Sequence, residues 1–330
     1  MKSCAHLCKV RNLFMQKKDS YCSGMRLKAS IIAGINWFSL FKNEVDAINV
    51  FPVPDADTGK NIHSTFLSIL EYLKKADHHR VWDVAEKSAE GALMGARGCS
   101  GIIISGFFKG FSEVVGSRSR LSALDLANCF KAASLKAYET VVEPREGTIL
   151  TVAKDMANAT LKAAKKIPRL SVVIKTAYEV ARESLEATPK KLEILAKNGV
   201  VDAGGLGLVY FLEGMERYNF GRSIKKVSGD HTILVRPSFS KQTIPSRFCA
   251  ELILSSNTIE RRRLEDILTR LGDSLIISGL KAPTGKEMIY KIHIHTKEPK
   301  LVLMKLSELG RVNEIKVDDM QKQHLDSLKK

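Results

Sequence analysis

The 330-residue sequence lacks any apolar run near the ~20 residues that a membrane-spanning helix needs. It also lacks the continuous apolar segment of a secretory signal peptide near its N-terminus. Its six cysteines show no paired spacing except Cys4 with Cys8. These absences argue against a disulfide-stapled secreted scaffold and favour free thiols in a reducing compartment. We therefore expect a cytoplasmic protein with no stable membrane insertion.

Acidic residues are scarce relative to basic ones. The chain has 52 Lys plus Arg against 36 Asp plus Glu, which gives a formal charge of +16. The basic residues are scattered, and no aromatic-studded basic strand or recognition-helix motif accompanies them. The pattern predicts a solvated basic surface and no nucleic-acid partner, while the positive field favours phosphate-bearing ligands.

Apolar residues make up 44% of the chain, enough to build a sizeable core and two domains. After an N-terminal extension over residues 1–24, residues such as Leu27, Ile31 and Ile35 recur at helical spacing, and no alternating strand pattern interrupts them. We predict an all-α helical barrel of about eight helices over residues 25–221. The helical patterns cover residues 27–43, 62–73, 80–95, 101–115, 122–140, 148–165, 170–187, 189–197 and 204–218.

The pattern changes after about residue 221. Residues 222–245 contain Pro237 and Pro245 and are predicted to hold a linker and a first strand at 232–236. The order of strands and helices that follows suggests a small α+β domain of ferredoxin-like type over residues 246–320, ahead of a tail at 321–330. The expected strands are 247–254, 273–278, 288–296 and 312–317, and the expected helices are 259–271 and 301–309.

The most distinctive stretch is Asn49 to Asn61, which reads Asn-Val-Phe-Pro-Val-Pro-Asp-Ala-Asp-Thr-Gly-Lys-Asn. Its two prolines exclude a helix, and Asp55 and Asp57 follow them directly. Magnesium prefers hard oxygen ligands and usually takes one or two carboxylates plus nucleotide phosphates. We therefore predict a rigid metal and phosphate loop, with Thr58 and Asn61 behind the carboxylates.

Three later junctions between predicted helices are also rich in small and polar residues. Residues 95–101 place three glycines and Ser100 before an apolar run, so that free backbone N–H groups lead into a helix N-terminus and could cradle phosphate. Thr148 is a capping hydroxyl at another helix start, and Asp202 is either an N-cap or a ligand contact. Taken singly, each junction is most simply a helix cap or a tight packing contact. Loops at one end of a helical barrel can nevertheless meet at one pocket.

A second group of chemically active residues lies in the C-terminal part. His293 and His295 alternate with isoleucines, so on a strand both imidazoles share one face. Cys249 lies in another strand-like run, and a thiolate with two imidazoles is a sound zinc ligand set. From residue types alone, two surface histidines and an unrelated core cysteine are the simpler interpretation.

In their order and spacing, four motifs resemble the DAK2 or DhaL-type kinase domain of the bacterial fatty-acid kinase A subunit. They are the acidic stretch, Gly-Ala-Arg-Gly-Cys-Ser-Gly, Glu-Gly-Thr-Ile-Leu-Thr-Val and Gly-Val-Val-Asp-Ala-Gly-Gly-Leu-Gly. The later runs Arg-Phe-Cys-Ala-Glu-Leu-Ile-Leu and Lys-Ile-His-Ile-His-Thr resemble the middle domain of the same protein family. The resemblance covers about residues 25–320.

The resemblance implies a helical barrel that binds ATP with two Mg²⁺ ions through Asp55 and Asp57. Asn49 stands near the position of a third metal-binding aspartate in dihydroxyacetone kinase relatives. It further implies phosphorylation of a fatty acid held by a separate carrier protein, a DegV-like B subunit, to give an acyl phosphate for phospholipid synthesis. The zinc ligands of the family's middle domain map onto Cys249, His293 and His295.

We interpret Asp55 and Asp57 as catalytic through the metal ions that they hold, because phosphoryl transfer depends mainly on positioning and charge neutralisation. The acceptor carboxylate is already ionised and needs no general base. A homodimer is compatible with this interpretation. The residues expected to contact the nucleotide are Thr58, Asn61, Gly98, Cys99, Ser100, Gly101, Thr148 and Asp202.

The sequence also departs from the family pattern. Ala56 and Lys60 replace a glycine and a threonine; Ala56 is expected to be harmless at a negative φ, and Lys60 either reaches a phosphate or points outward. No counterpart of the family's carrier-binding C-terminal domain follows Lys330, which suggests a truncation or a differently divided protein. Two alternatives stay open: a kinase subunit for dihydroxyacetone or another small polyol or ketone, and a noncatalytic nucleotide-binding scaffold. The proline-rich stretch and the appended domain argue against the first.

Overall fold

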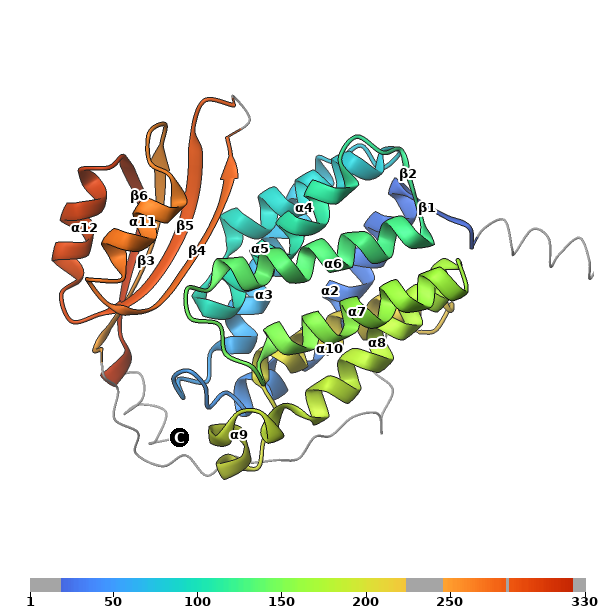
Figure 1. The fold of residues 1–330 in the computed structure, drawn as a ribbon, viewed down its shortest axis with the longest axis horizontal. Helices are drawn as coiled ribbons and strands as arrows, with labels where there is room; N and C mark the ends of the chain where they lie inside the picture. The colour runs from blue at the N-terminus through green and yellow to red at the C-terminus, as the bar shows by residue number, and fades with distance from the viewer. Residues whose placement is uncertain (1–18, 224–245, 283–284, 323–330) are drawn as a thin grey trace, which may run out of the picture.

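The computed structural model describes residues 19–223, 246–282 and 285–322, which form a helical domain and a smaller sheet domain beside it (Figure 1). The predicted strand at 232–236 lies outside these residues. In the described part of the chain, no helix is both long and apolar enough to cross a membrane.

The helical domain is a closed ring. Following the chain, each helix packs on the next from α2 to α8, and α10 packs on both α8 and α2, so that eight helices enclose a common core with α9 outside the ring. This confirms the predicted eight-helix barrel. The helices are α2 (Gly24–Ala47), α3 (Thr58–Lys74), α4 (Val81–Gly95), α5 (Gly98–Val115), α6 (Ala123–Thr140), α7 (Ile149–Lys166), α8 (Leu170–Glu186), α9 (Glu193–Asn198) and α10 (Ala203–Asn219), with a 3₁₀ turn at Thr188–Lys190.

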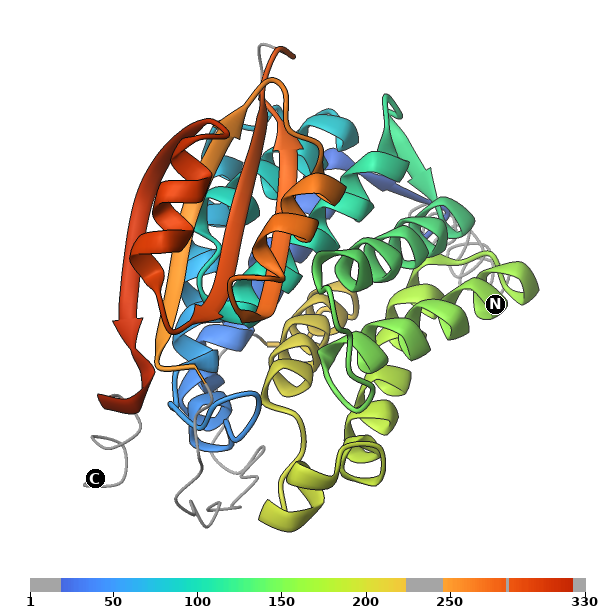
Figure 2. The ribbon, with the colours of Figure 1, turned by 60° about the vertical axis from the view of Figure 1, so that its left-hand side comes forward.

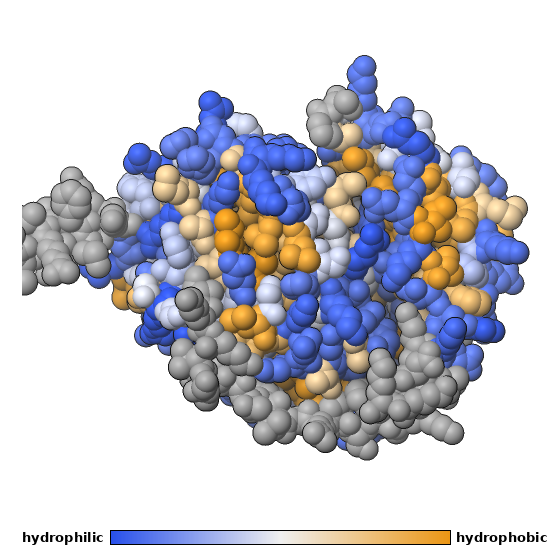
Figure 3. Space-filling view, turned by 180° about the vertical axis from the view of Figure 1, so that it is seen from behind, coloured by the Kyte–Doolittle hydropathy of each residue, from blue (hydrophilic) through white to orange (hydrophobic). Residues whose placement is uncertain are grey.

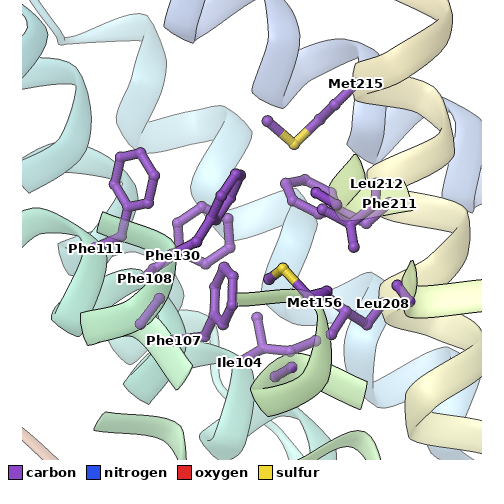
Figure 4. Packing of buried hydrophobic residues seen from close by; sticks show 14 of the residues in the cluster. Ile104, Phe107, Phe108, Phe111, Phe130, Met156, Leu208, Phe211, Leu212 and Met215 are labelled. Atoms are coloured by element: carbon purple, nitrogen blue, oxygen red, sulfur yellow. The ribbon is translucent and has the colours of Figure 1, made fainter. Parts of the chain in front are cut away.

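Aromatic and aliphatic side chains fill the inside of the ring, as Figure 4 shows. The rings of Phe108 and Phe211 meet edge to face at 5.9 Å between centroids, which joins α5 to α10 across the core. Met156 of α7 lies in the same cluster. Because the interior is occupied by apolar side chains, polar ligands are excluded from it and must bind at an end of the barrel.

A short two-stranded sheet is not expected from the sequence. Strand β1 (Tyr21–Ser23) pairs antiparallel with β2 (Arg120–Ser122), although the sequence pattern places Tyr21–Ser23 in the N-terminal extension. Each strand ends in a serine that caps the following helix: Ser23 accepts the Arg26 N–H, and Ser122 forms a capping box with Asp125. Strands of three residues are too short to show an alternating pattern.

The sheet domain has the order β3 (Phe248–Ser256), α11 (Arg261–Leu268), β4 (Asp273–Lys281), β5 (Met288–Thr296), α12 (Pro299–Ser307) and β6 (Arg311–Asp319). The strands are arranged β4-β5-β3-β6, and every neighbouring pair is antiparallel. This is the ferredoxin-like arrangement that the sequence predicted.

The two faces of this sheet differ in chemistry because side chains alternate along each strand. Leu252, Ile292 and Ile294 belong to a core with residues of α11 and α12. The opposite face carries buried ionisable side chains, including Glu251 and His293, and lies over the helical domain near α5 (Figure 2). The sheet is therefore covered on both sides, and its polar face is an interface between the domains.

Backbone, apolar and charged contacts all cross this interface. The Val142 N–H donates to the Leu275 carbonyl at 3.2 Å, Ile276 packs with the core of the helical domain, and the Gly98 N–H donates to Glu251.

Seen from behind, the surface of the molecule is mostly hydrophilic, with apolar residues gathered in separate areas (Figure 3).

Helices α2 and α10 approach closely through glycine, and this contact is testable. A Cβ added to Gly214 would lie 2.6 Å from the Ala33 carbonyl oxygen and from the Trp37 Cβ. Gly214→Ala is therefore expected to lower the free energy of unfolding by about 1–3 kcal/mol through overpacking, measured by urea titration. Lys162→Ala, at an exposed position of α7, should change it by less than about 0.5 kcal/mol. Equal stability of the two variants would contradict the close contact.

Candidate functional site

The acidic loop connects α2 to α3, and Asp46 at the end of α2 organises it. The Asp46 Oδ1 accepts the N–H groups of Gly59 and Lys60, at 2.7 and 3.1 Å, in the first turn of α3. Asp57, which immediately precedes α3, makes no capping hydrogen bond with its side chain. Because Asp46 satisfies the helix N-terminus, the Asp57 carboxylate is left to serve a ligand. No sequence pattern pointed to this role of Asp46.

Asn49, Asp55 and Asp57 form the acidic centre of the loop. Asn49 is only 1% exposed; its Nδ2 donates to Asp55 Oδ1 at 2.7 Å, while its own Oδ1 is buried without a partner. Burial, followed by the neighbouring Asp57 carboxylate, holds the pKa of Asp55 well above its usual range. Two adjacent carboxylates and an unpaired carbonyl oxygen fit a hard divalent cation such as Mg²⁺, which would neutralise the acids and satisfy the orphan oxygen.

The two residues that depart from the family pattern have definite positions. The condition under which Ala56 would be harmless, a negative φ, is not met, because its φ is 55°, a left-handed conformation that favours glycine. The Lys60 Nζ donates to the Ala56 carbonyl at 3.3 Å and lies 3.9 Å from Asp46 Oδ2. The Lys60 side chain therefore folds back over the acidic loop.

The second predicted loop leads into α5. Gly98 has a φ of +59°, and its N–H donates to Glu251 Oε1 at 2.5 Å. The Gly101 N–H is used inside the helix, where it donates to the Arg97 carbonyl, and Gly101 packs closely against Thr65 of α3. Two of the N–H groups that were expected to be free are therefore engaged. Cys99 and Ser100 line the pocket described below.

The sheet brings the predicted zinc ligands together. Its register places Cys249 opposite His295 and Glu251 opposite His293 on neighbouring strands. His293 Nε2 lies 3.0 Å from His295 Nε2, and Cys249 Sγ lies 3.4 Å from His293 Nδ1. Burial lowers the pKa of His295 to about 3, so this imidazole is neutral at pH 7 and has a lone pair for a metal. The set fits the ligand chemistry of zinc.

Two further residues belong to this cluster although the sequence did not assign them to it: Glu251 was not named, and Cys99 was predicted only as a nucleotide contact. Glu251 is 3% exposed, and its Oε1 lies 3.0 Å from His293 Nδ1. It stands two residues after Cys249, so strand alternation alone could have placed it on the same face. Cys99 Sγ lies 3.1 Å from His293 Nε2. No sequence pattern predicts that contact, because it depends on how the two domains dock.

The acidic loop and the Cys/His cluster line the same pocket. This narrow pocket, of about 40 Å³, lies between the domains, and Thr58 and Asn61 also face it. Two sites that the sequence presented as separate are therefore one. Its lining residues include Asn49, Asp55 and Asp57 from the loop, Gly98, Cys99 and Ser100 from α5, and Cys249, Glu251, His293, His295, Lys316 and Asp318 from the sheet.

A larger cleft of about 390 Å³ adjoins this pocket and shares Pro52, Cys99 and Ser100 with it. Thr148 and Asp202 also line the cleft, and both domains contribute to its walls. Its apolar lining residues include Phe51, Ile103, Val141, Ile149, Leu150, Leu275 and Ile276.

The polar residues of the cleft begin two helices. Thr148 caps α7, as the sequence predicted, and Asp202 caps α10 by accepting the Gly205 N–H at 2.7 Å, which is one of the two roles predicted for it. In the described part of the chain, no basic side chain forms a hydrogen bond or ion pair with Asp202. Burial raises the pKa of its carboxyl group to about 6. A buried carboxylate at the edge of a cleft is well suited to bind a ligand as well as to cap a helix.

Comparison with known proteins matches both parts of the chain. The DAK2 domain model matches residues 52–217, and the model of the FakA-like middle domain, named for fatty acid kinase, matches residues 246–327. Protein YloV of Bacillus subtilis is 34% identical over 315 residues, covering 91% of this chain and 56% of that protein. An uncharacterized protein of Staphylococcus saprophyticus is 32% identical over 323 residues, covering 94% of this chain and 57% of that protein.

The chain thus spans little more than half the length of these relatives. Among solved structures, the dihydroxyacetone kinase of C. freundii matches with a TM-score of 0.44 and 17% identity, over 58% of this chain and 34% of that one. The DAK2 model covers half of the 330 residues, and the middle-domain model follows in the expected order. The chain therefore belongs to the DAK2 family of kinase domains and carries a FakA-like middle domain of the fatty acid kinase type.

Proposed function

We propose that this chain catalyses ATP-dependent phosphorylation of a fatty-acid carboxylate, giving an acyl phosphate for phospholipid synthesis. The observation that supports this proposal most is the convergence of Asn49, Asp55 and Asp57 on a pocket between the two domains. The family supports a kinase, and the middle-domain match favours a fatty acid over a small polyol or ketone as the acceptor.

Asn49, Asp55 and Asp57 are the residues that would hold two magnesium ions. Bound there, the ions would neutralise the charge of a triphosphate, which is the main requirement for phosphoryl transfer. The unpaired Asn49 Oδ1 and the raised pKa of Asp55, caused by burial and by Asp57, both favour a cation at this position. The chain's own contribution is to hold these oxygens rigidly through Asp46 and the start of α3.

The larger cleft suits the nucleoside. Its volume of about 390 Å³ falls in the usual range for small-molecule sites, and side chains such as Ile103 and Leu275 offer apolar walls to a purine. We place polar nucleoside groups near Thr148 and Asp202, and phosphates near Ser100, where the cleft meets the acidic pocket. The remaining predicted contacts are Thr58, Asn61, Gly98, Cys99 and Gly101.

The acceptor would enter from a separate fatty-acid carrier, a DegV-like B subunit, in the cytoplasm. The carboxylate of the fatty acid is ionised at neutral pH and would attack the γ-phosphorus of ATP without a general base. The bond from the γ-phosphorus to the bridging oxygen breaks, and ADP leaves. Lys316 also lines the acidic pocket, where its Nζ is paired with Asp318 Oδ2 at 2.5 Å. Zinc would be held by Cys249, His293 and His295 on the sheet side of the pocket. A homodimer is compatible with the proposed function.

Loss of either loop carboxylate should abolish turnover. In an assay with ATP, Mg²⁺ and a fatty-acid-loaded carrier, with acyl phosphate trapped by hydroxylamine, Asp55→Asn and Asp57→Asn are each expected to lower the rate by at least about 100-fold. Asp266→Asn, at an exposed position of α11, is the matched control and should leave the rate unchanged. Wild-type rates in both loop variants would rule out the metal assignment. Turnover with dihydroxyacetone but no acyl phosphate would shift the acceptor to a small ketone.

Asn49 should set the requirement for magnesium. Because its Oδ1 is the buried atom without a partner, Asn49→Ala is expected to raise the Mg²⁺ concentration for half-maximal turnover by about 10–100-fold. Asn49→Asp keeps an oxygen at that position and should restore most of the affinity. If the magnesium titration of Asn49→Ala matches that of the parent, Asn49 is not a metal ligand.

The charged form of Asp202 is expected to lower the stability of the fold while serving ATP binding. Its pKa is raised to about 6 by burial, so its ionisation destabilises the folded state as the pH rises from about 4 to 6, by up to ~3 kcal/mol at higher pH. Asp202→Asn keeps a good N-cap without the charge. It should raise the free energy of unfolding at pH 8 but not at pH 3, below the unfolded pKa, and lower ATP turnover at neutral pH. A stability difference that does not change with pH would contradict the origin assigned to the shift.

A further inference from the structure

The end of the barrel that lies away from the two pockets has a surface chemistry of its own. The junctions α3–α4, α5–α6 and α7–α8 lie there, together with the start of α2 and the end of α10. Figure 1 shows β1 and β2 at this end, on the side opposite to the sheet domain. We call it the distal end, and its segments are residues 19–26, 74–80, 116–124, 165–171 and 218–223.

Contacts between the segments show that the distal end is one continuous surface. Each contact joins two segments that are distant in sequence: β1 with β2, Arg26 with Asn219, Asp19 with Ser171, and Gly24 with the backbone of His78 and Arg80. The hydrogen bond from Arg26 Nη2 to Asn219 Oδ1 is 2.7 Å long, and the one from the Ser171 N–H to Asp19 Oδ1 is 2.9 Å long. Side chains on any of these segments can therefore reach the same partner.

Apolar side chains are concentrated at the distal end. Of the twelve large hydrophobic residues that the described part of the chain exposes, six lie here, with 37–57% of their surface exposed. They are Tyr21, Met25, Leu124, Ile167, Tyr218 and Phe220. Single exposed apolar residues are common on any protein, whereas several gathered on one surface indicate a place of contact.

Cations without acidic partners lie among these apolar side chains. The nearby acids already have partners, since Asp77 pairs with Arg80 and Asp125 pairs with Arg118. In the part of the chain that the structure describes, several exposed cations of the distal end form no ion pair, and these include Lys75, Arg120, Lys165, Lys166 and Arg169. Ile167 stands within the turn that carries three of them. The surface therefore offers positive charge and apolar contact together.

We infer that the distal end docks on the surface of an anionic lipid bilayer. Lys and Arg side chains would reach the charged headgroups, while the aliphatic and aromatic side chains enter the interfacial layer beneath them. Nucleic acid is a poorer fit, because aliphatic side chains such as Met25, Leu124 and Ile167 offer its phosphates and bases neither charge nor stacking.

Docking in this orientation leaves the acidic pocket and the larger cleft facing away from the bilayer, because both lie at the other end of the barrel beside the sheet domain. The inference goes beyond the proposed function and does not depend on it.

Co-sedimentation of the full chain with vesicles at physiological salt tests the inference. The chain is expected to bind phosphatidylcholine vesicles that contain about one third phosphatidylglycerol, and to bind pure phosphatidylcholine at least about 10-fold more weakly. The triple variant Lys165→Glu, Lys166→Glu and Arg169→Glu should lose at least about 10-fold in affinity for the anionic vesicles, because each basic residue at such a surface contributes roughly five-fold. An unchanged unfolding midpoint would show that this variant keeps its fold.

A matched triple variant separates docking from total charge. Lys286→Glu, Lys297→Glu and Lys300→Glu make the same charge change at exposed positions of the sheet domain, and should alter the vesicle affinity by less than about two-fold, since charges beyond a Debye length are screened. Leu124→Ser with Ile167→Ser should weaken binding at least about 10-fold even at raised salt, because apolar burial is not screened.

Three outcomes would overturn the inference. They are absence of binding to the anionic vesicles, equal losses in the two triple variants, and displacement of the chain from vesicles by a double-stranded RNA that binds the distal end more tightly. The assay contains neither ATP nor a carrier, so failure of the proposed function would leave its result unchanged. Acyl phosphate formation in solution should in turn be equal in the parent and in the distal triple variant.

Discussion

Glu251 makes the contacts on which the shared pocket depends. Its buried carboxylate accepts the Gly98 N–H from the helical domain and pairs with His293 of the sheet. A buried charge is tolerated only when such partners compensate for lost hydration. The partners of Glu251 come from both domains, so the pairing fixes how the sheet sits over the end of α5. The acidic loop and the Cys/His cluster face each other as a consequence.

The layout of the pocket separates two kinds of metal chemistry by ligand type. Oxygen ligands of the acidic loop suit magnesium, whereas sulfur and nitrogen ligands of the sheet suit zinc. In the proposed mechanism the oxygen side neutralises the phosphates, and a zinc ion held by Cys249, His293 and His295 would face it from the sheet side. Residues of both sides line the same small pocket, and Cys99 and Ser100 border both that pocket and the larger cleft.

Much of the fold could be predicted from periodicity. Helical spacing in the first two thirds of the chain and strand alternation around His293 led to the barrel and the ferredoxin-like sheet, both of which the structure has. The cap at Thr148 was also predicted, and an N-cap was one of the two roles predicted for Asp202, since a capping side chain acts on its own helix. The positive φ of Ala56 was not predicted. A glycine at this position would have indicated a left-handed conformation, whereas an alanine does not. Domain docking, and with it the contact of Cys99 with His293, depends on surfaces distant in sequence.

The central claim is that residues of both domains form one site for Mg-ATP. A crystal structure of the chain with Mg²⁺ and a nonhydrolysable ATP analogue tests it most directly. The account predicts metal ions between the phosphates and the oxygens of Asn49, Asp55 and Asp57, with the base in the cleft lined by Thr148 and Leu275. A nucleotide bound elsewhere, with the acidic loop free of metal, would contradict it.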